Sequence, residues 1–152
     1  MSAPALVARL TELGQTVAVA ESLTAGLVTA RLADVPGASA VLRGGVVAYA
    51  ADLKVSLLGV PAELVEQQGV VAADVAAAMA AGVAARLGAD HGLATTGVAG
   101  PDTLDGKPPG TVYVAHAGPA GVVVRALHLP GDRAEVRLGS VSAVLELFLG
   151  RL

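Results

Sequence analysis

The sequence contains no cysteine and no tryptophan, and it has one phenylalanine and two tyrosines among its 152 residues. The absence of cysteine excludes disulfides, thiol nucleophiles and zinc sites built on cysteine. The three histidines never occur at a metal-ligand spacing such as HxxxH, so we expect no metal and no other cofactor. With few aromatic rings, no basic stripe and a net charge of −3, we expect no nucleic-acid partner either.

Charged residues are also scarce. They make up 15% of the chain, against 54% hydrophobic residues, and the mean hydropathy is +0.67. This composition excludes intrinsic disorder, which needs low hydrophobicity and high charge. Because a small domain has a large surface to cover, we expect apolar surface to be buried between copies in a homo-oligomer.

No stretch of the sequence is suited to crossing a membrane. A spanning helix needs about 18 or more apolar residues, whereas the longest charge-free run, between Lys107 and Arg125, is broken by prolines and glycines. The N-terminus lacks the basic start, apolar run and cleavage site of a signal peptide. We therefore expect a cytoplasmic protein with no membrane partner.

Hydrophobic periodicity predicts helices and strands that alternate along a single domain of residues 1–152. Helices are expected over 5–13, 24–33, two short segments within 52–68, 72–87 and 132–149. Strands are expected over 16–20, 43–50, 91–96, 111–117 and 122–129. Since the last two strands form a hairpin, the fold class is predicted to be α/β, a three-layer α/β/α sandwich with a mixed sheet.

The first candidate site is the turn AESLTAG at 20–26, between a predicted strand and a predicted helix. A hydroxyl such as that of Ser22 would face unpaired backbone N–H groups and the positive end of the helix dipole, which stabilise an oxyanion or a phosphate. Gly26 would let a ligand approach the backbone closely. The alternative is that Ser22 or Thr24 is simply the N-cap of the helix.

Tyr49 and Lys54 form the second candidate. The chain has two lysines against eight arginines, so a lysine indicates a role that arginine cannot fill. A desolvated lysine can lose its proton and act as a base. The alternative is a solvated surface lysine beside a half-buried tyrosine.

The third candidate is the segment TTGVAGPD at 95–102, closed by residues 107–111. Glycines after a strand leave backbone N–H groups free to bind an anion, and Lys107 lies in the same loop. Long loops are more often functional than short ones. The alternative is an ordinary Gly/Pro-rich loop.

Arg133 and Arg137 form the fourth candidate, because residues four apart share one helix face. A bound phosphate would relieve their repulsion from each other and from the helix dipole. The alternative is surface pairing with Asp132 and Glu135, which also resemble a capping box.

The three histidines are interpreted as structural. His91 begins a predicted strand, and His116 and His128 alternate with apolar neighbours, so that either can face solvent. Because no Asp, Glu or Ser pattern surrounds them, we do not predict a Ser-His-Asp triad.

Taken in order, five segments resemble the C-terminal domain of the CinA family, the nicotinamide-mononucleotide amidohydrolases also called PncC. They are AESLTAG at 20–26, GGVVAYAADLK at 44–54, ATTGVAGP at 94–101, KPPGTVYVA at 107–115 and LPGDRAEVR at 129–137. The resemblance spans nearly the whole chain. It implies hydrolysis of the amide of nicotinamide mononucleotide (NMN) to nicotinate mononucleotide and ammonia, with this small-molecule nucleotide as the partner.

The mechanistic hypothesis is acyl transfer through a serine. Ser22 would attack the carboxamide carbon, and Lys54 would take its proton, with Tyr49 as a relay. Backbone N–H groups around residues 24–26, together with Thr96, would hold the oxyanion. The residues expected to bind the nucleotide are Thr24, Gly26, Gly97, Gly100, Arg133 and Arg137.

The chain departs from the family's usual pattern at several positions. Where the family usually has Cys, Gly, Asn, Ser and Gly, this sequence has Leu23, Ala25, Ala51, Ala72 and Asp102. Two alternatives therefore stand beside NMN hydrolysis. One is a non-catalytic nucleotide-binding or sensor domain of the same fold, and the other is an amidase for a different small amide.

Overall fold

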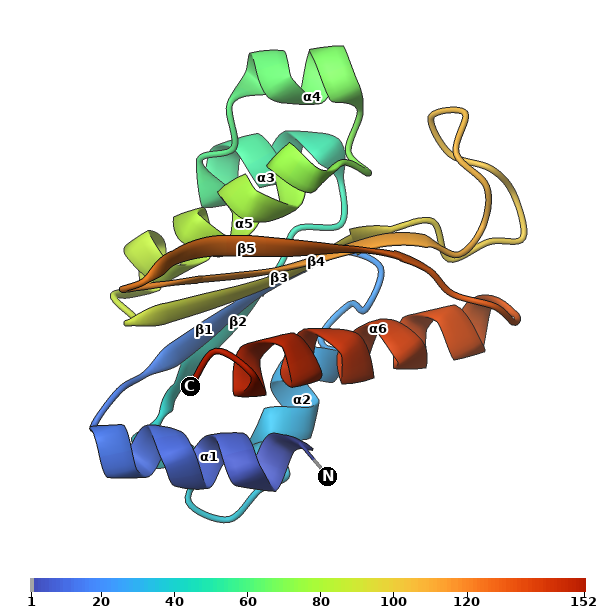
Figure 1. The fold of residues 1–152 in the computed structure, drawn as a ribbon. Coiled ribbons are helices and arrows are strands. Elements are labelled where there is room, and N and C mark those ends of the chain that lie inside the picture. Colours follow the sequence, from blue (N-terminus) through green and yellow to red (C-terminus); the bar gives the residue numbers. More distant parts are fainter. Residues whose placement is uncertain (1) are drawn as a thin grey trace.

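Five strands form one mixed sheet in the order β2-β1-β3-β4-β5 (Figure 1). The structure is a computed structural model that describes residues 2–152. The strands are β1 (Val17–Glu21), β2 (Leu42–Val47), β3 (His91–Gly97), β4 (Thr111–Gly118) and β5 (Gly121–His128). Strand β1 pairs in parallel with β2 and β3, whereas β3, β4 and β5 are antiparallel neighbours. The predicted mixed sheet with its hairpin is confirmed.

Helices cover both faces of this sheet. They are α1 (Ser2–Leu13), α2 (Leu27–Ala33), α3 (Ala51–Leu58), α4 (Ala62–Gln68), α5 (Ala73–Leu87) and α6 (Arg133–Leu149), with a short 3-10 turn η1 (Ala38–Ala40). Helices α3, α4 and α5 lie on one side of the sheet, and α1, α2 and α6 lie on the other (Figure 1). A buried apolar cluster fills the space on each side. The predicted three-layer sandwich in a single domain is confirmed.

Helix α5 packs closely on β3 and on α3 because glycines stand at the contacts. A Cβ atom on Gly92 of β3 would collide with the carbonyl oxygen of Ala80 in α5, and one on Gly82 would collide with that of Leu58 in α3. Glycine permits such close approach because it has no side chain. The contact fixes α3, which carries Lys54, relative to the sheet.

Two predicted boundaries are wrong near the carboxyl ends of the parallel strands. Helix α2 begins at Leu27, three residues later than expected, and β2 ends at Val47, three residues earlier. In both places the backbone forms a turn around a buried polar side chain, as described below. The predicted capping box of α6 is confirmed, since Asp132 and Glu135 each accept the backbone N–H of the other.

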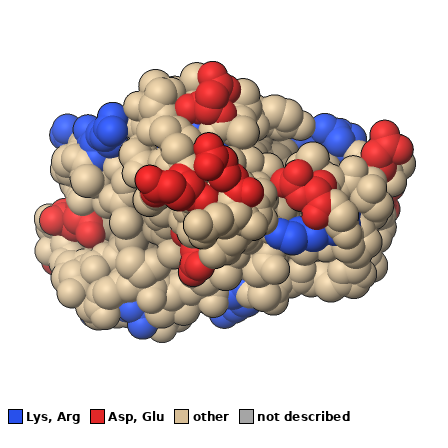
Figure 2. Space-filling view, turned by 90° about the horizontal axis from the view of Figure 1, so that it is seen from above, with Lys and Arg blue, Asp and Glu red and all other residues tan. Residues whose placement is uncertain are grey.

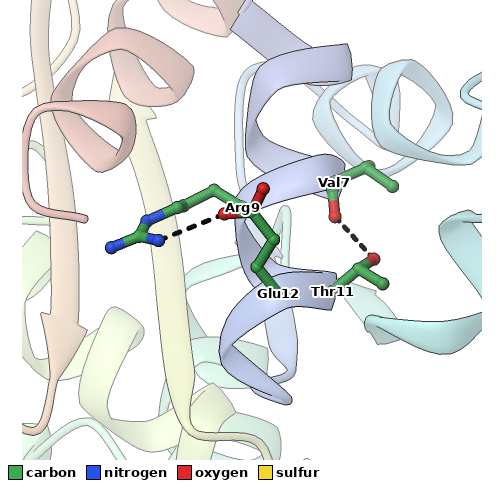
Figure 3. A network of polar contacts seen from close by, with 4 residues as sticks. All are labelled: Val7, Arg9, Thr11 and Glu12. Carbon is green, nitrogen blue, oxygen red and sulfur yellow. Dashed lines mark hydrogen bonds and ion pairs between the residues drawn. The ribbon is translucent and has the colours of Figure 1, made fainter.

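Acidic side chains gather on the face formed by α3, α4 and α5 (Figure 2). The exposed acidic residues of these helices are Asp52, Glu63, Glu66 and Asp74. On the other side of the sheet, α1 carries an exposed ion pair between Arg9 and Glu12, 3.1 Å apart (Figure 3). Exposed pairs of this kind contribute little to stability. None of the helices within residues 2–152 is long and apolar enough to cross a membrane.

His91 and His116 form a buried pair at the amino end of β3. Nδ1 of His91 lies 3.0 Å from Nε2 of His116, and Nε2 of His91 lies 2.8 Å from Oε1 of Gln15. The ring of Phe148 packs against both imidazoles. His116 therefore does not face solvent, because β4 is an inner strand covered by α6, whereas His128 on the edge strand β5 is exposed.

The histidine pair is held in its neutral form. Desolvation by burial, together with the nearby His91 and Arg151, lowers the pKa of His116 from 6.5 to about 4. Nδ1 of His116 has no hydrogen-bond partner, so a proton placed there would be buried without an acceptor. The pair thus stabilises the fold only while it is uncharged.

We predict that the free energy of unfolding falls as the pH drops from about 6.5 towards 4. Because folding lowers the pKa of His116, the unfolded chain binds the proton more readily, and acid favours unfolding. Urea unfolding at pH 7, 6 and 5 measures this dependence, and His128→Gln serves as the exposed control that leaves it unchanged. A midpoint that stays constant from pH 7 to 5 would contradict the prediction.

Candidate active site

A cleft of about 250 Å³ opens at the carboxyl ends of the parallel strands β1 and β3. Open α/β sheets commonly bind ligands at this edge. The cleft is lined by Ser22, Leu23, Tyr49, Val70, Thr96, Gly97, Val98, Ala99, Gly100, Pro101, Asp102, Leu104 and Arg133. The fold thus brings together six predicted site residues, Ser22, Tyr49, Thr96, Gly97, Gly100 and Arg133.

Lys54 is fully buried and reaches Ser22 from α3. Its Nζ lies 3.0 Å from Oγ of Ser22, 2.7 Å from the carbonyl oxygen of Ala48 and 3.2 Å from that of Tyr49. Strand β2 ends at Val47 because the two following carbonyl groups turn towards this amine. The alternative of a solvated surface lysine is therefore wrong.

Burial makes the neutral form of Lys54 easier to reach than that of an exposed lysine. Desolvation by burial lowers the pKa of this amine from 10.5 to about 8. Within residues 2–152, no carboxylate bonds to the amine and no group of metal-ligating side chains is found. Carbonyl oxygens only accept hydrogen bonds, so the neutral amine keeps its two N–H groups on Ala48 and Tyr49. Its lone pair is then left for the hydroxyl of Ser22, which is the arrangement of a nucleophile and its base.

Glu21, the last residue of β1, is fully buried and directly precedes Ser22. Its Oε1 accepts the backbone N–H of Val28 at 2.9 Å, and its Oε2 accepts the N–H and the hydroxyl of Thr29 at 3.0 and 2.7 Å. The positive end of the α2 dipole stabilises this carboxylate. Two expectations for the turn are therefore wrong. Neither Ser22 nor Thr24 caps α2, and its amino end is not open to a substrate anion because Glu21 occupies it.

Free backbone N–H groups nevertheless remain at the cleft. Leu23, Ala99 and Gly100 are among the residues that line it, and their backbone N–H groups donate to no other group in the described part of the chain. Amides of this kind can donate to an oxyanion that forms in the cleft. They come from the turn after β1 and the loop after β3, rather than from a helix end.

Thr24 and Gly26 do not line the cleft. Oγ1 of Thr24 lies 2.8 Å from Oγ1 of Thr95, and Gly26 is the residue before α2 with a φ of 101°. Thr95, the first residue of the third candidate segment but without a predicted role of its own, also accepts the N–H of Ser22 on its carbonyl oxygen at 3.1 Å. These residues support the turn that carries Ser22 and do not line the cleft.

Thr96 lines the cleft, but its hydroxyl is engaged. It donates to the carbonyl oxygen of Val70 at 2.7 Å, so its single proton is not free for an oxyanion. Asp105 accepts the N–H of Val70 at 3.2 Å, and Lys107 donates to the carbonyl oxygen of Val71. The loop after β3 thus holds the segment before α5 in the cleft wall, and Lys107 has a structural role there.

Arg133 and Tyr49 meet at the edge of the cleft. Nη2 of Arg133 donates to the hydroxyl of Tyr49 at 3.0 Å, and Nη1 donates to the carbonyl oxygen of Gly100 at 2.6 Å. The Tyr49 side chain is 54% exposed, and its hydroxyl bonds to neither Lys54 nor Ser22. The geometry therefore does not support Tyr49 as a proton relay.

Arg137 does not line the cleft. Its Nε donates to the carbonyl oxygen of Leu23 at 2.8 Å, and its Nη2 lies 3.5 Å from that of Thr24. The expectation that both arginines bind a phosphate is corrected for Arg137, which holds the turn that carries Ser22. Surface pairing with Asp132 and Glu135 does not occur either, because those two side chains cap α6.

We predict that Glu21→Gln lowers the free energy of unfolding by about 2–4 kcal/mol. The amide side chain turns an NH₂ group towards an N–H donor of α2 and removes the charge that the helix dipole stabilises. Urea unfolding measures the loss. Glu12→Gln, in the exposed ion pair of α1, is the matched control and is expected to change stability by less than about 1 kcal/mol. Equal losses in the two variants would contradict the role of Glu21.

Known proteins share both the sequence and the fold. The profile of the CinA C-terminal domain matches residues 2–152. A CinA-like protein of Frankia casuarinae is 54% identical over 91% of this chain and 32% of its own length, and one of Geobacter sulfurreducens is 47% identical over 96% and 36%. The chain thus spans about a third of the length of these curated relatives.

Two solved structures are closely similar as well. The competence/damage inducible protein CihA of Agrobacterium tumefaciens has a TM-score of 0.94 and 35% identity, covering 98% of this chain and 92% of the other. A competence-damaged protein (CinA) superfamily protein of Escherichia coli has a TM-score of 0.96 and 30% identity, covering 99% and 88%. Three findings agree, namely a profile match over nearly the whole chain, relatives above 45% identity and solved structures with the same fold. The chain therefore belongs to the CinA C-terminal domain family.

Proposed function

We propose that the protein hydrolyses the amide of NMN to nicotinate mononucleotide and ammonia, with Ser22 as the nucleophile. The observation that carries this proposal is the contact of 3.0 Å between Nζ of Lys54 and Oγ of Ser22 at the cleft. A buried amine whose other two partners are carbonyl oxygens is suited to take the serine proton.

The chemistry follows from these contacts as an acyl transfer. Ser22 Oγ gives its proton to neutral Lys54 and bonds to the carboxamide carbon, whose oxygen becomes an oxyanion. The free amides at Leu23, Ala99 and Gly100 are the groups suited to hold that oxyanion. The Lys54 ammonium then returns the proton to the departing nitrogen, and ammonia leaves. Water releases nicotinate mononucleotide from the serine ester, and the proton passes back through Lys54 to Ser22.

Arg133 is the proposed ligand for the 5′-phosphate. It lines the cleft, and its two bonded nitrogens contact neutral acceptors, the carbonyl oxygen of Gly100 and the hydroxyl of Tyr49. A phosphate oxygen carries negative charge and accepts a stronger hydrogen bond from a guanidinium group than either neutral oxygen does. The proposal therefore assigns Tyr49 to the phosphate end of the cleft rather than to proton transfer.

We predict that purified protein releases ammonia from NMN and that Ser22→Ala and Lys54→Ala each lower this activity by about 1000-fold or more. Lys54→Arg is expected to be as inactive, because arginine keeps its proton and has no lone pair for Ser22. Arg125→Ala, on the exposed edge strand β5, is the control that retains activity.

The same reaction has an expected pH dependence. Because the base must be neutral and its pKa is about 8, kcat/KM is expected to rise as the pH increases through about 8. Tight binding of NMN without ammonia release would instead support a nucleotide-binding or sensor domain. Release from other small amides but not from NMN would support an amidase of different specificity.

We also propose that the protein forms a homo-oligomer. Both edge strands, β2 and β5, lack a second neighbour in the sheet. Large apolar side chains that are at least two-fifths exposed are Leu13, Val47, Tyr49, Leu57, Leu104, Val122 and Leu138. A second copy could cover such surface.

The expected result is a mass of at least twice the chain's 14.9 kDa in light scattering, with dissociation on dilution. A monomer mass across the whole dilution series would contradict this proposal. That outcome would leave the catalytic proposal untouched, because Ser22 and Lys54 come from the same chain.

A further inference from the structure

The cleft contains two side chains of opposite charge that do not pair with each other. Arg133 and Asp102 both line it. The guanidinium group donates to Gly100 and Tyr49, and the ion pair found within residues 2–152 is the distant one on α1. The carboxylate of Asp102 is therefore free to meet a ligand.

Asp102 stands on a loop whose ends are tied down. The N–H of Val98 donates to Thr111 at 2.8 Å, and the N–H of Gly110 donates to Val98 at 2.8 Å. Between these points, Leu104 and Lys107 form a small antiparallel bridge with two backbone hydrogen bonds. Asp102, as a residue of the cleft lining, thus stands on an ordered backbone, so a ligand would not have to order the loop first.

We propose that Asp102 is a specificity-determining residue that recognises positive charge on the ring of the bound ligand, while Arg133 binds its anionic end. The ligand class is a zwitterion with an aromatic cation, such as an N-substituted pyridinium, and an acidic group. A carboxylate and a guanidinium group in one cleft match both charges, whereas a neutral ring gains nothing from the carboxylate. This inference rests on the proposed function for the identity of the ligand. Its test measures binding alone and does not depend on that function.

The expected preference is modest because Asp102 is exposed. An attraction between exposed charges typically changes an equilibrium constant by a factor of about 3–5. Salt weakens it, since the Debye length shrinks from about 20–30 Å at low salt to about 4 Å at about 0.5 M. A preference based on shape alone would not respond to salt in this way.

The experiment compares two rings that differ in charge and carry no phosphate. 1-Methylnicotinamide is a cation and nicotinamide is neutral, and the binding of both is measured by NMR titration. Ser22→Ala is the common background, so that neither amide is hydrolysed. Asp102→Asn is added to remove the charge at nearly constant size, and Asp52→Asn, on the exposed first turn of α3, is the matched control.

The expected result is about 3- to 5-fold tighter binding of the cation to the background protein, a ratio near 1 in Asp102→Asn and an unchanged ratio in Asp52→Asn. The ratio is also expected to fall with added salt. An unchanged ratio in Asp102→Asn would overturn the proposal, and so would equal binding, or no binding, of the two rings to the background protein. Failure of the protein to hydrolyse NMN would not overturn this proposal, because the comparison measures binding and involves no turnover.

Discussion

The site depends on how the fold accommodates one buried amine. Lys54 is among the largest fully buried side chains of the described residues, and a lysine in that position loses the hydration of its charge. Two backbone carbonyls and one hydroxyl replace the lost water. Three features position these groups around the amine: the early end of β2, the close packing of α3 on α5 and the orientation of Ser22. The same burial that costs stability lowers the pKa of the amine to about 8, which brings its neutral form within reach at mildly alkaline pH.

Glu21, directly before Ser22, is a second buried polar group that shapes the site. Successive residues of a strand point to opposite faces, so the chain sends one side chain towards α2 and the next towards Lys54. The positive end of the α2 dipole stabilises the carboxylate of Glu21 and is not open to a ligand. The amino end of α2 is therefore not available to negative charge in the cleft, which leaves the loop amides and the guanidinium group of Arg133.

The sequence was sufficient for the layers, the mixed sheet and most of the residues at the cleft. Periodicity and glycine or proline breaks are local signals, and they located nearly every element to within a few residues. These local signals did not predict element ends or side-chain contacts that depend on a group far away in the sequence. Glu21 displaced the start of α2, Lys54 ended β2, and Arg137 turned to the carbonyl oxygens of another segment. Thr95 belonged to a candidate segment, but its role gave no local signal because its hydrogen bonds to the turn of Ser22 cross more than seventy residues.

The contacts of Arg133 have a consequence for the speed of ligand binding. Its long side chain is already ordered on a carbonyl and a phenol oxygen, so little rotamer freedom remains to be lost when an anion arrives. Exchange of these neutral acceptors for an anionic one requires rotation about the outer side-chain bonds, with the backbone of α6 in place. On the proposed function, an anion would meet a guanidinium group that is already ordered, so its association would be governed by diffusion and by removal of water from the anion.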